Sequence, residues 1–279
     1  MSIGSRTNLS EPEREILLRK AGRPSFFVGY LRPILFVAFI VCTANSPAQT
    51  ADNPYYGLRN TWGIFGAYSP RVSGIPTGYP AYHELLDIGV SYNRRLSVSR
   101  NVNWQFSAEL LPVALESDPL SREVDIQTEP TPGIVLDFTV PASTCAPSSH
   151  PYSFTDPTTG TTYAGTALSY CQGRRWTIGA AISPVGMQWD FRPLHKTQPF
   201  IVWHGGYMYS TQPIPVLNAG AFNFTVDLGA GVEIFRSRNR SIRAEYRYHH
   251  LSNANTAAEN PGVESGLFQL TYCFGFGRQ

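Results

Sequence analysis

A histidine, a serine and a carboxylate lie close together near the C-terminal end of the chain. His250 precedes Ser252 by two residues, and Glu264 follows across a segment rich in Asn, Gly and Pro. A serine hydroxyl becomes a nucleophile when a histidine takes its proton, and a carboxylate holds that histidine in the required tautomer. The three residue types could therefore hydrolyse an ester. Asn253 and Asn260 are nearby candidates for stabilising the oxyanion that such a reaction forms.

The residues before Ser252 alternate between apolar and polar side chains, which is typical of a β-strand. Because residues two apart point to the same side of a strand, His250 and Ser252 share one face with Tyr246 and Tyr248. Glu264 is in phase with the apolar residues of the following strand. The sequence thus predicts that all three groups meet on one side of a hairpin, the outward side of the sheet.

Segments of about ten alternating residues recur along the chain, which is typical of a transmembrane β-barrel. The apolar faces are rich in Tyr, Trp and Phe, as at membrane interfaces, and the polar faces carry small residues and charges of both signs. We therefore expect an all-β fold, an eight-stranded antiparallel transmembrane β-barrel. The expected strands are 58–68, 84–96, 101–113, 173–187, 198–209, 220–235, 240–252 and 264–276.

The links between these strands alternate in length, as in outer-membrane barrels with short periplasmic turns and longer outer loops. The loop 253–263 is one of the longer links and is expected to face the cell exterior. We expect 114–172 to be a long, mobile outer loop. Its apolar part could instead extend a neighbouring strand or form an extra pair of strands.

The N-terminal region differs from the rest of the chain. Basic residues precede an apolar run that is too short to span a bilayer as a helix and that is typical of a signal peptide. We predict that residues 1–51 are a leader and signal peptide, cleaved near 48–51, and that residues 52–279 form the barrel. An uncleaved membrane anchor is the alternative.

The net charge is +2 and the basic residues are scattered, which does not favour a nucleic-acid partner. The spacing of Cys and His is not typical of a zinc site, and we expect no metal and no cofactor. Cys145 and Cys171 could form a disulfide in an oxidising compartment, whereas Cys273 is expected to be unpaired.

The remaining histidines offer weaker signals. His249 is in the opposite phase from His250, so we expect it in the barrel interior, paired with Glu245 or another inward group. His83 and His204 have no convincing partners in the sequence.

The stretch His250-Leu251-Ser252-Asn253-Ala254, followed by Asn260-Pro261-Gly262-Val263-Glu264-Ser265, resembles the signature of the PagL family of outer-membrane lipid A deacylases. The resemblance implies hydrolysis of the ester-linked 3-hydroxyacyl chain of lipid A without a cofactor. It assigns Ser252 as the nucleophile, His250 as the base and Glu264 as the orienting acid, with Asn253 and Asn260 near the oxyanion. It also implies lipopolysaccharide as the substrate and a site at the outer leaflet of a Gram-negative outer membrane.

Two other classes of function stay open. A non-catalytic outer-membrane barrel could serve as a structural or adhesion protein that acts through the long loop 114–172. A narrow porin is disfavoured because side chains fill the interior of an eight-stranded barrel. The oligomeric state is also open, with a homodimer as one option.

Overall fold

The computed structural model describes residues 54–70 and 83–276, and the regular elements in these ranges are all β-strands. The predicted signal peptide lies outside the described residues. The strands are β1 (Asn60–Ser69), β2 (Glu84–Val98), β3 (Val102–Glu129), β4 (Gly133–Pro141), β5 (Ser148–Thr155), β6 (Thr162–Phe191), β7 (Thr197–Ser210), β8 (Phe222–Ser237), β9 (Arg240–Ser252) and β10 (Val263–Phe276). Within these described ranges, no helix has the length and hydropathy needed to cross a bilayer.

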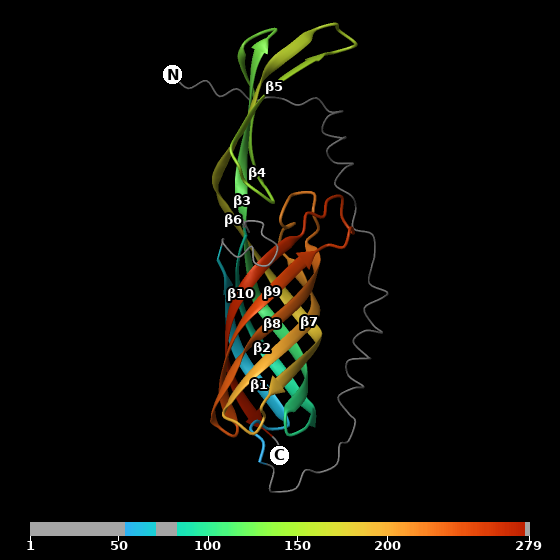
Figure 1. Cartoon of the computed structure of the whole chain (residues 1–279). Helices are drawn as coiled ribbons and strands as arrows, with labels where there is room; N and C mark the ends of the chain where they lie inside the picture. Colours follow the sequence, from blue (N-terminus) through green and yellow to red (C-terminus); the bar gives the residue numbers. More distant parts are fainter. Residues whose placement is uncertain (1–53, 71–82, 277–279) are drawn as a thin grey trace. The chain divides into compact units, whose positions relative to one another are not determined.

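Eight of the strands form an antiparallel ring (Figure 1). Neighbouring strands follow the order β3-β2-β1-β10-β9-β8-β7-β6, and β3 also pairs with β6. The first and last of the described strands, β1 and β10, meet in this ring, with Asn60 opposite Phe276. The expected antiparallel arrangement of eight strands is therefore confirmed.

The side chains of the ring are distributed with apolar groups outside and polar groups inside. Ile64 and Leu270 point outward and are 56% and 61% exposed, whereas the inward Asn93 and Gln188 are 1% and 2% exposed. Such an inverted distribution suits strands that are surrounded by hydrocarbon. The interior is filled: a cavity of about 10 Å³ is left among its polar side chains. A cavity of that size has room for about one water molecule, which disfavours a pore at this level.

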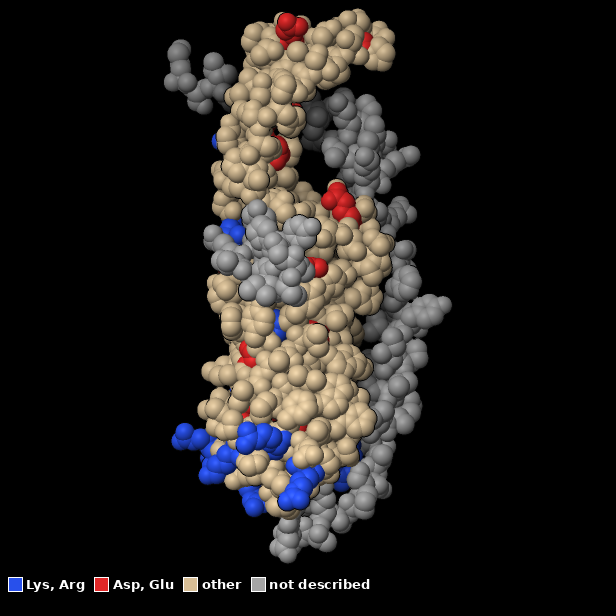
Figure 2. Space-filling model, viewed as in Figure 1, with Lys and Arg blue, Asp and Glu red and all other residues tan. Residues whose placement is uncertain are grey.

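Basic residues gather at the end of the barrel where the short turns lie (Figure 2). The turn between β2 and β3 carries Arg100, the link between β6 and β7 carries Arg192 and Lys196, and Arg236 and Arg238 lie around the turn between β8 and β9. All five side chains are exposed. Because charged groups are costly inside a bilayer, this end is expected to lie beyond the hydrocarbon.

The segment 114–172 is not the expected mobile loop, and the alternative holds: neighbouring strands are extended and two further strands are added. Here β3 and β6 continue beyond their last pairings with β2 and β7, and the additional strands β4 and β5 flank them (Figure 1). The result is a four-stranded extension in the order β4-β3-β6-β5. Sequence periodicity did not reveal it because β4 is exposed on both faces and thus lacks an alternating pattern.

A disulfide between Cys145 and Cys171 crosslinks this extension, and Cys273 is a free thiol buried in the ring. The bridge closes a loop with a sequence separation of 26. Loop-closure entropy predicts a stabilisation of about 3 kcal/mol for a loop of that order. We expect a Cys145→Ser/Cys171→Ser variant to be cleaved faster by protease in the extension while the ring stays resistant. Equal cleavage of the oxidised and bridge-free proteins would contradict this, and Cys273→Ser is the control.

Candidate active site

His250 and Glu264 face each other across the hairpin formed by β9 and β10. They are directly opposite in the strand register, and the His250 Nδ1 lies 3.9 Å from the Glu264 Oε1. Both side chains point outward, with 35% and 41% of their surfaces exposed. The structure therefore brings the predicted base and acid together on the outer side of the sheet, where a ligand can reach them.

Ser252 lies on the same outward face, two residues beyond His250 at the end of β9. Its backbone pairs with Phe224 of β8, an exposed apolar residue. Within the described residues, the Ser252 hydroxyl makes no hydrogen bond with the His250 ring. Catalytic hydrogen bonds are often long in a free enzyme and tighten when substrate binds.

Tyr248 is the next outward residue of β9 on the side toward the barrel middle. Its hydroxyl interacts with the Glu264 carboxylate through a side-chain hydrogen bond. Glu264 therefore has two neighbours on β9, His250 and Tyr248, which restrict where its carboxylate can point. The sequence analysis did not select Tyr248, although its phase with His250 could have indicated the contact.

Apolar side chains support this hairpin from within the barrel. Leu251 lies between His250 and Ser252 in the chain, points inward and is 1% exposed. It forms one buried cluster with Val263 and with Ile214 from the loop between β7 and β8. Because buried apolar groups pack closely, the cluster limits movement of the strands that carry the outward residues.

Hydrogen bonds made by its asparagines stabilise the loop 253–262. The Asn260 Oδ1 accepts a hydrogen bond from the Asn253 backbone N–H at 3.0 Å, and the Asn253 Nδ2 donates to the Glu259 carbonyl at 2.6 Å. The Asn253 Oδ1 accepts from the Asn255 N–H at 2.9 Å. The two asparagines predicted near the oxyanion are thus engaged in holding the loop that follows Ser252.

Two further features fix the loop. Ala254 and Asn255 have φ values of 51° and 61°, a left-handed conformation that is costly for residues other than glycine. Asn218, from the loop between β7 and β8, donates to the Glu259 carboxylate at 2.8 Å and accepts from the Glu259 N–H at 3.2 Å. A strained backbone held by surrounding contacts is common next to catalytic groups.

Comparison with protein families gives one match, to the family described as Lipid A 3-O-deacylase (PagL), over residues 143–272. The resemblance to the PagL family is confirmed. The matched PagL region covers slightly less than half of the chain and includes His250, Ser252 and Glu264. It begins after β4 and so omits the first strands of the ring.

Among solved structures, the outer-membrane enzyme PagL is similar with 13% identity and a TM-score of 0.40, over 78% of this chain and 99% of that one. Neisserial surface protein A is 12% identical with a TM-score of 0.34, over 80% and 98%. The outer-membrane protein OprG from Pseudomonas aeruginosa is 7% identical with a TM-score of 0.40, over 81% and 99%. A comparison with curated proteins finds no match.

The other histidines lie outside the outward site formed by His250, Ser252 and Glu264, and two of them differ from expectation. His249 is inward as predicted, and its partner is Asp227, with the Nδ1 2.7 Å from the Oδ1. His204 lies 2.9 Å from the Ser107 hydroxyl, and His83 lies 3.1 Å from Asp118. The prediction that His83 and His204 lack partners was wrong. Their partners are distant in the chain, so local spacing could not identify them.

Gly262 allows a test of how strictly the outward site depends on its loop. Its φ is +66°, and a β-carbon there would lie 3.7 Å from the His250 Cε1, which is an ordinary contact. Alanine would therefore fit, but the left-handed backbone would cost about 1–2 kcal/mol. If the loop relaxes away from His250, we expect Gly262→Ala to reduce ester hydrolysis by about 5- to 30-fold.

The matched control is Gly160→Ala. Gly160 has a φ of +69° in the turn between β5 and β6, and no atom lies within 4 Å of its added carbon. The two variants carry the same backbone strain, so a rate measured on each separates strain at the site from strain elsewhere. Equal rates for both would show that the Gly262 conformation does not matter for activity.

Proposed function

We propose that the protein is an outer-membrane lipid A 3-O-deacylase, a serine esterase that removes the ester-linked 3-hydroxyacyl chain. The observation that carries this proposal is the outward pairing of His250 with Glu264, beside Ser252, in a region that matches the PagL family. Polar and ionisable groups on the lipid side of a barrel are costly and usually functional. A substrate whose acyl chains lie in the surrounding leaflet explains their position.

In the proposed reaction, the Ser252 hydroxyl attacks the ester carbonyl while His250 takes the hydroxyl proton. Glu264 orients the imidazole and stabilises its charged form. The tetrahedral intermediate expels the sugar hydroxyl, which receives the proton from His250, and leaves the acyl group on Ser252. Water, activated by His250, then releases the 3-hydroxy fatty acid and restores the serine. Every atom in these reaction steps comes from the ester, from water or from the three side chains, so no cofactor is required.

The oxyanion would be stabilised by donors from the loop after Ser252. An asparagine amide nitrogen carries two hydrogens, so Asn253 and Asn260 can each hold the loop and still offer a donor. The backbone N–H of Ala254 is a further candidate, since it follows Ser252 closely in the left-handed segment. Donors fixed before the reaction are effective because they need no reorganisation as the charge develops.

The proposed location is the outer membrane, with lipopolysaccharide as the substrate. The site lies at the end of β9 that is opposite the short, basic turns. If those turns face the periplasm, the site is at the outer leaflet, where lipid A resides. A non-catalytic barrel that acts through the segment 114–172 is not favoured by the family match.

Expression of the wild-type chain in a Gram-negative host with 3-acylated lipid A tests the proposal. We expect mass spectrometry of extracted lipid A to show the loss of one 3-hydroxyacyl chain relative to cells with an empty vector. Unchanged lipid A from cells with correctly inserted protein would count against the activity. A lipid A that lacks the 3-linked chain is the control substrate and should stay unmodified.

The orientation can be tested separately with an epitope tag inserted between Ala257 and Glu259. This part of the loop is exposed or half-buried and lies next to the proposed site. We expect an antibody to bind the tag on intact cells. Binding only after the outer membrane is opened would place the site in the periplasmic leaflet and contradict the assignment of lipid A as substrate.

A further inference from the structure

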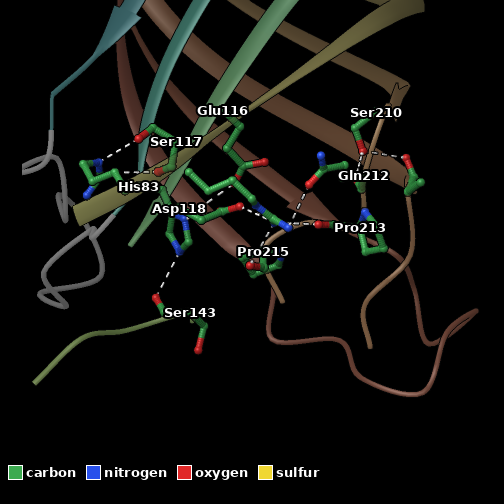
Figure 3. A network of polar contacts seen from close by, with 12 residues as sticks. His83, Glu116, Ser117, Asp118, Ser143, Ser210, Gln212, Pro213 and Pro215 are labelled. Atoms are coloured by element: carbon green, nitrogen blue, oxygen red, sulfur yellow. Dashed lines mark hydrogen bonds and ion pairs between the residues drawn. The ribbon is translucent and has the colours of Figure 1, made fainter. Parts of the chain in front are cut away.

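Three buried side chains lie close together (Figure 3), near the end of β2 that is away from the short turn between β2 and β3. His83 immediately precedes β2, and Glu116 and Asp118 lie two residues apart on β3. Their ring nitrogen and carboxylate oxygens lie within 4.8 Å of one another. None of the three belongs to the outward site, and the PagL match begins beyond all of them.

The hydrogen bonds of His83 indicate which of its nitrogens carries a proton. Its Nε2 lies 3.0 Å from the Ser143 carbonyl oxygen, which can only accept, so the Nε2 donates. Its Nδ1 then faces the Asp118 Oδ1 at 3.1 Å and the Glu116 Oε1 at 3.6 Å. In a neutral ring the Nδ1 carries a lone pair, and a lone pair that faces two carboxyl groups is stabilised by a positive centre between them, either a proton or a metal ion.

Glu116 has the clearest need for such a centre. Its side chain is 0% exposed, and within the described residues its carboxylate oxygens have no hydrogen-bond partner apart from the neighbouring carboxyl group of Asp118. The charges that act on it include two further carboxylates, Asp118 and Asp87, and the guanidinium of Arg175. A buried carboxylate is costly unless it is paired or binds a metal.

We propose that His83, Glu116 and Asp118 bind one divalent transition-metal ion, with Zn²⁺ as the representative. The Nδ1 of His83 and one oxygen of each carboxylate would be the ligands. Ligands about 2.0–2.2 Å from a tetrahedral zinc are about 3.3–3.6 Å apart, which is close to the 3.1 and 3.6 Å between the Nδ1 and the two oxygens. A mixed imidazole and carboxylate set suits such an ion.

The surroundings of the three ligands also fit a metal site. The bond from the His83 Nε2 to the Ser143 carbonyl is the outer contact that metal-bound histidines usually make. Arg175 donates to the Asp118 Oδ2 at 2.7 Å, which directs the other oxygen, Oδ1, toward His83.

A second group of inward residues provides a contrast. Glu109, His204 and Asp227 also have their polar atoms close together. There, however, Arg247 donates to both oxygens of Glu109 at 2.7 and 3.0 Å and lies 3.9 Å from Asp227. The guanidinium already supplies the positive charge, so this group has no comparable need for a metal ion.

The bound ion would stabilise the loop end of the barrel. Besides Asp118, Arg175 donates to the Pro213 carbonyl at 2.7 Å, in the loop between β7 and β8. Ile214 of that loop packs with Leu251 and Val263, which adjoin the outward residues of β9 and β10. The metal would thus connect His83, immediately before β2, with Ser143 after β4 and with the loop that supports the outward site.

The test uses the full-length protein, purified in detergent, stripped of metal by chelation and titrated with Zn²⁺ alone. We expect about one Zn²⁺ per chain to remain after removal of the excess, measured by elemental analysis, and a higher unfolding temperature in its presence. Glu116→Gln and His83→Gln should each weaken binding by at least about tenfold. The measurement does not depend on esterase activity, so its result tests the metal site independently of the proposed function.

Two control variants exclude loose binding to the surface. Asp137→Asn removes one exposed carboxylate and His150→Gln one exposed imidazole, and both should retain the bound Zn²⁺. The alternative is that a proton, and not a metal ion, lies among the three side chains. In that case the wild type would retain no Zn²⁺, and the proposal would be overturned. Retention that is equal in wild type, Glu116→Gln and His83→Gln would overturn it as well.

Discussion

Replacement of Ser252 by alanine is expected to reduce lipid A deacylation by about 10³-fold or more, because it removes the atom that forms the acyl intermediate. No other outward serine lies beside the pair of His250 and Glu264 within the described residues. The remaining groups could at most activate water, which is a poorer route than acyl transfer. The measurement is the initial rate of fatty-acid release from lipid A by purified protein in mixed micelles.

The same substitution should leave the fold intact. Ser252 is half-buried at the end of β9, and loss of one hydroxyl at such a position usually changes stability by less than about 0.5 kcal/mol. Ser237→Ala is the matched control, since Ser237 is an exposed residue at the opposite end of the barrel. A Ser252→Ala protein that retains more than about a tenth of the rate would exclude the proposed nucleophile.

The outward site was predictable because it is local. His250 and Ser252 are two residues apart, so strand alternation alone places them on one face, and the hairpin places Glu264 opposite. The geometry supports the proposal that these residues hydrolyse an ester, and the rate measurements test it. The sequence did not indicate Tyr248 as a site residue, because a tyrosine among outward aromatic residues is explained by contact with lipid.

The sequence left the extension open as an alternative but did not favour it, and it did not indicate the partners of the buried polar groups, for two physical reasons. The exposed strand β4 has no inward face, so its sequence carries no alternating signal. The partners of the buried groups depend on which strands become neighbours around the ring. Asp118 is 35 residues from His83, and Glu109 is 138 residues from Arg247. The ring had to be known before those pairs could be recognised.

Arg247 is the interior residue whose loss should destabilise the barrel most. Its guanidinium donates to Glu109 twice, and its Nη2 lies 2.6 Å from the Glu245 Oε1. All three side chains are at least nine-tenths buried. Arg247→Met fills a similar volume without the charge and leaves two or more carboxylates uncompensated. We expect the free energy of unfolding to fall by about 3–5 kcal/mol.

The cause of that loss can be identified by removing a second charge. In Arg247→Met/Glu109→Gln one of the uncompensated carboxylates is gone, so the double variant should be more stable than Arg247→Met alone. Arg122→Met is the control for loss of an arginine, because its pair with Asp137 is exposed on the extension and should contribute little. Urea titration of protein folded in lipid vesicles gives the free energy of unfolding of the wild type and of the three variants.

If Arg247→Met loses no more stability than Arg122→Met, the interior charges are already balanced by other groups. A double variant less stable than Arg247→Met would show instead that Glu109 contributes through packing, since removal of an unpaired charge cannot by itself destabilise the fold.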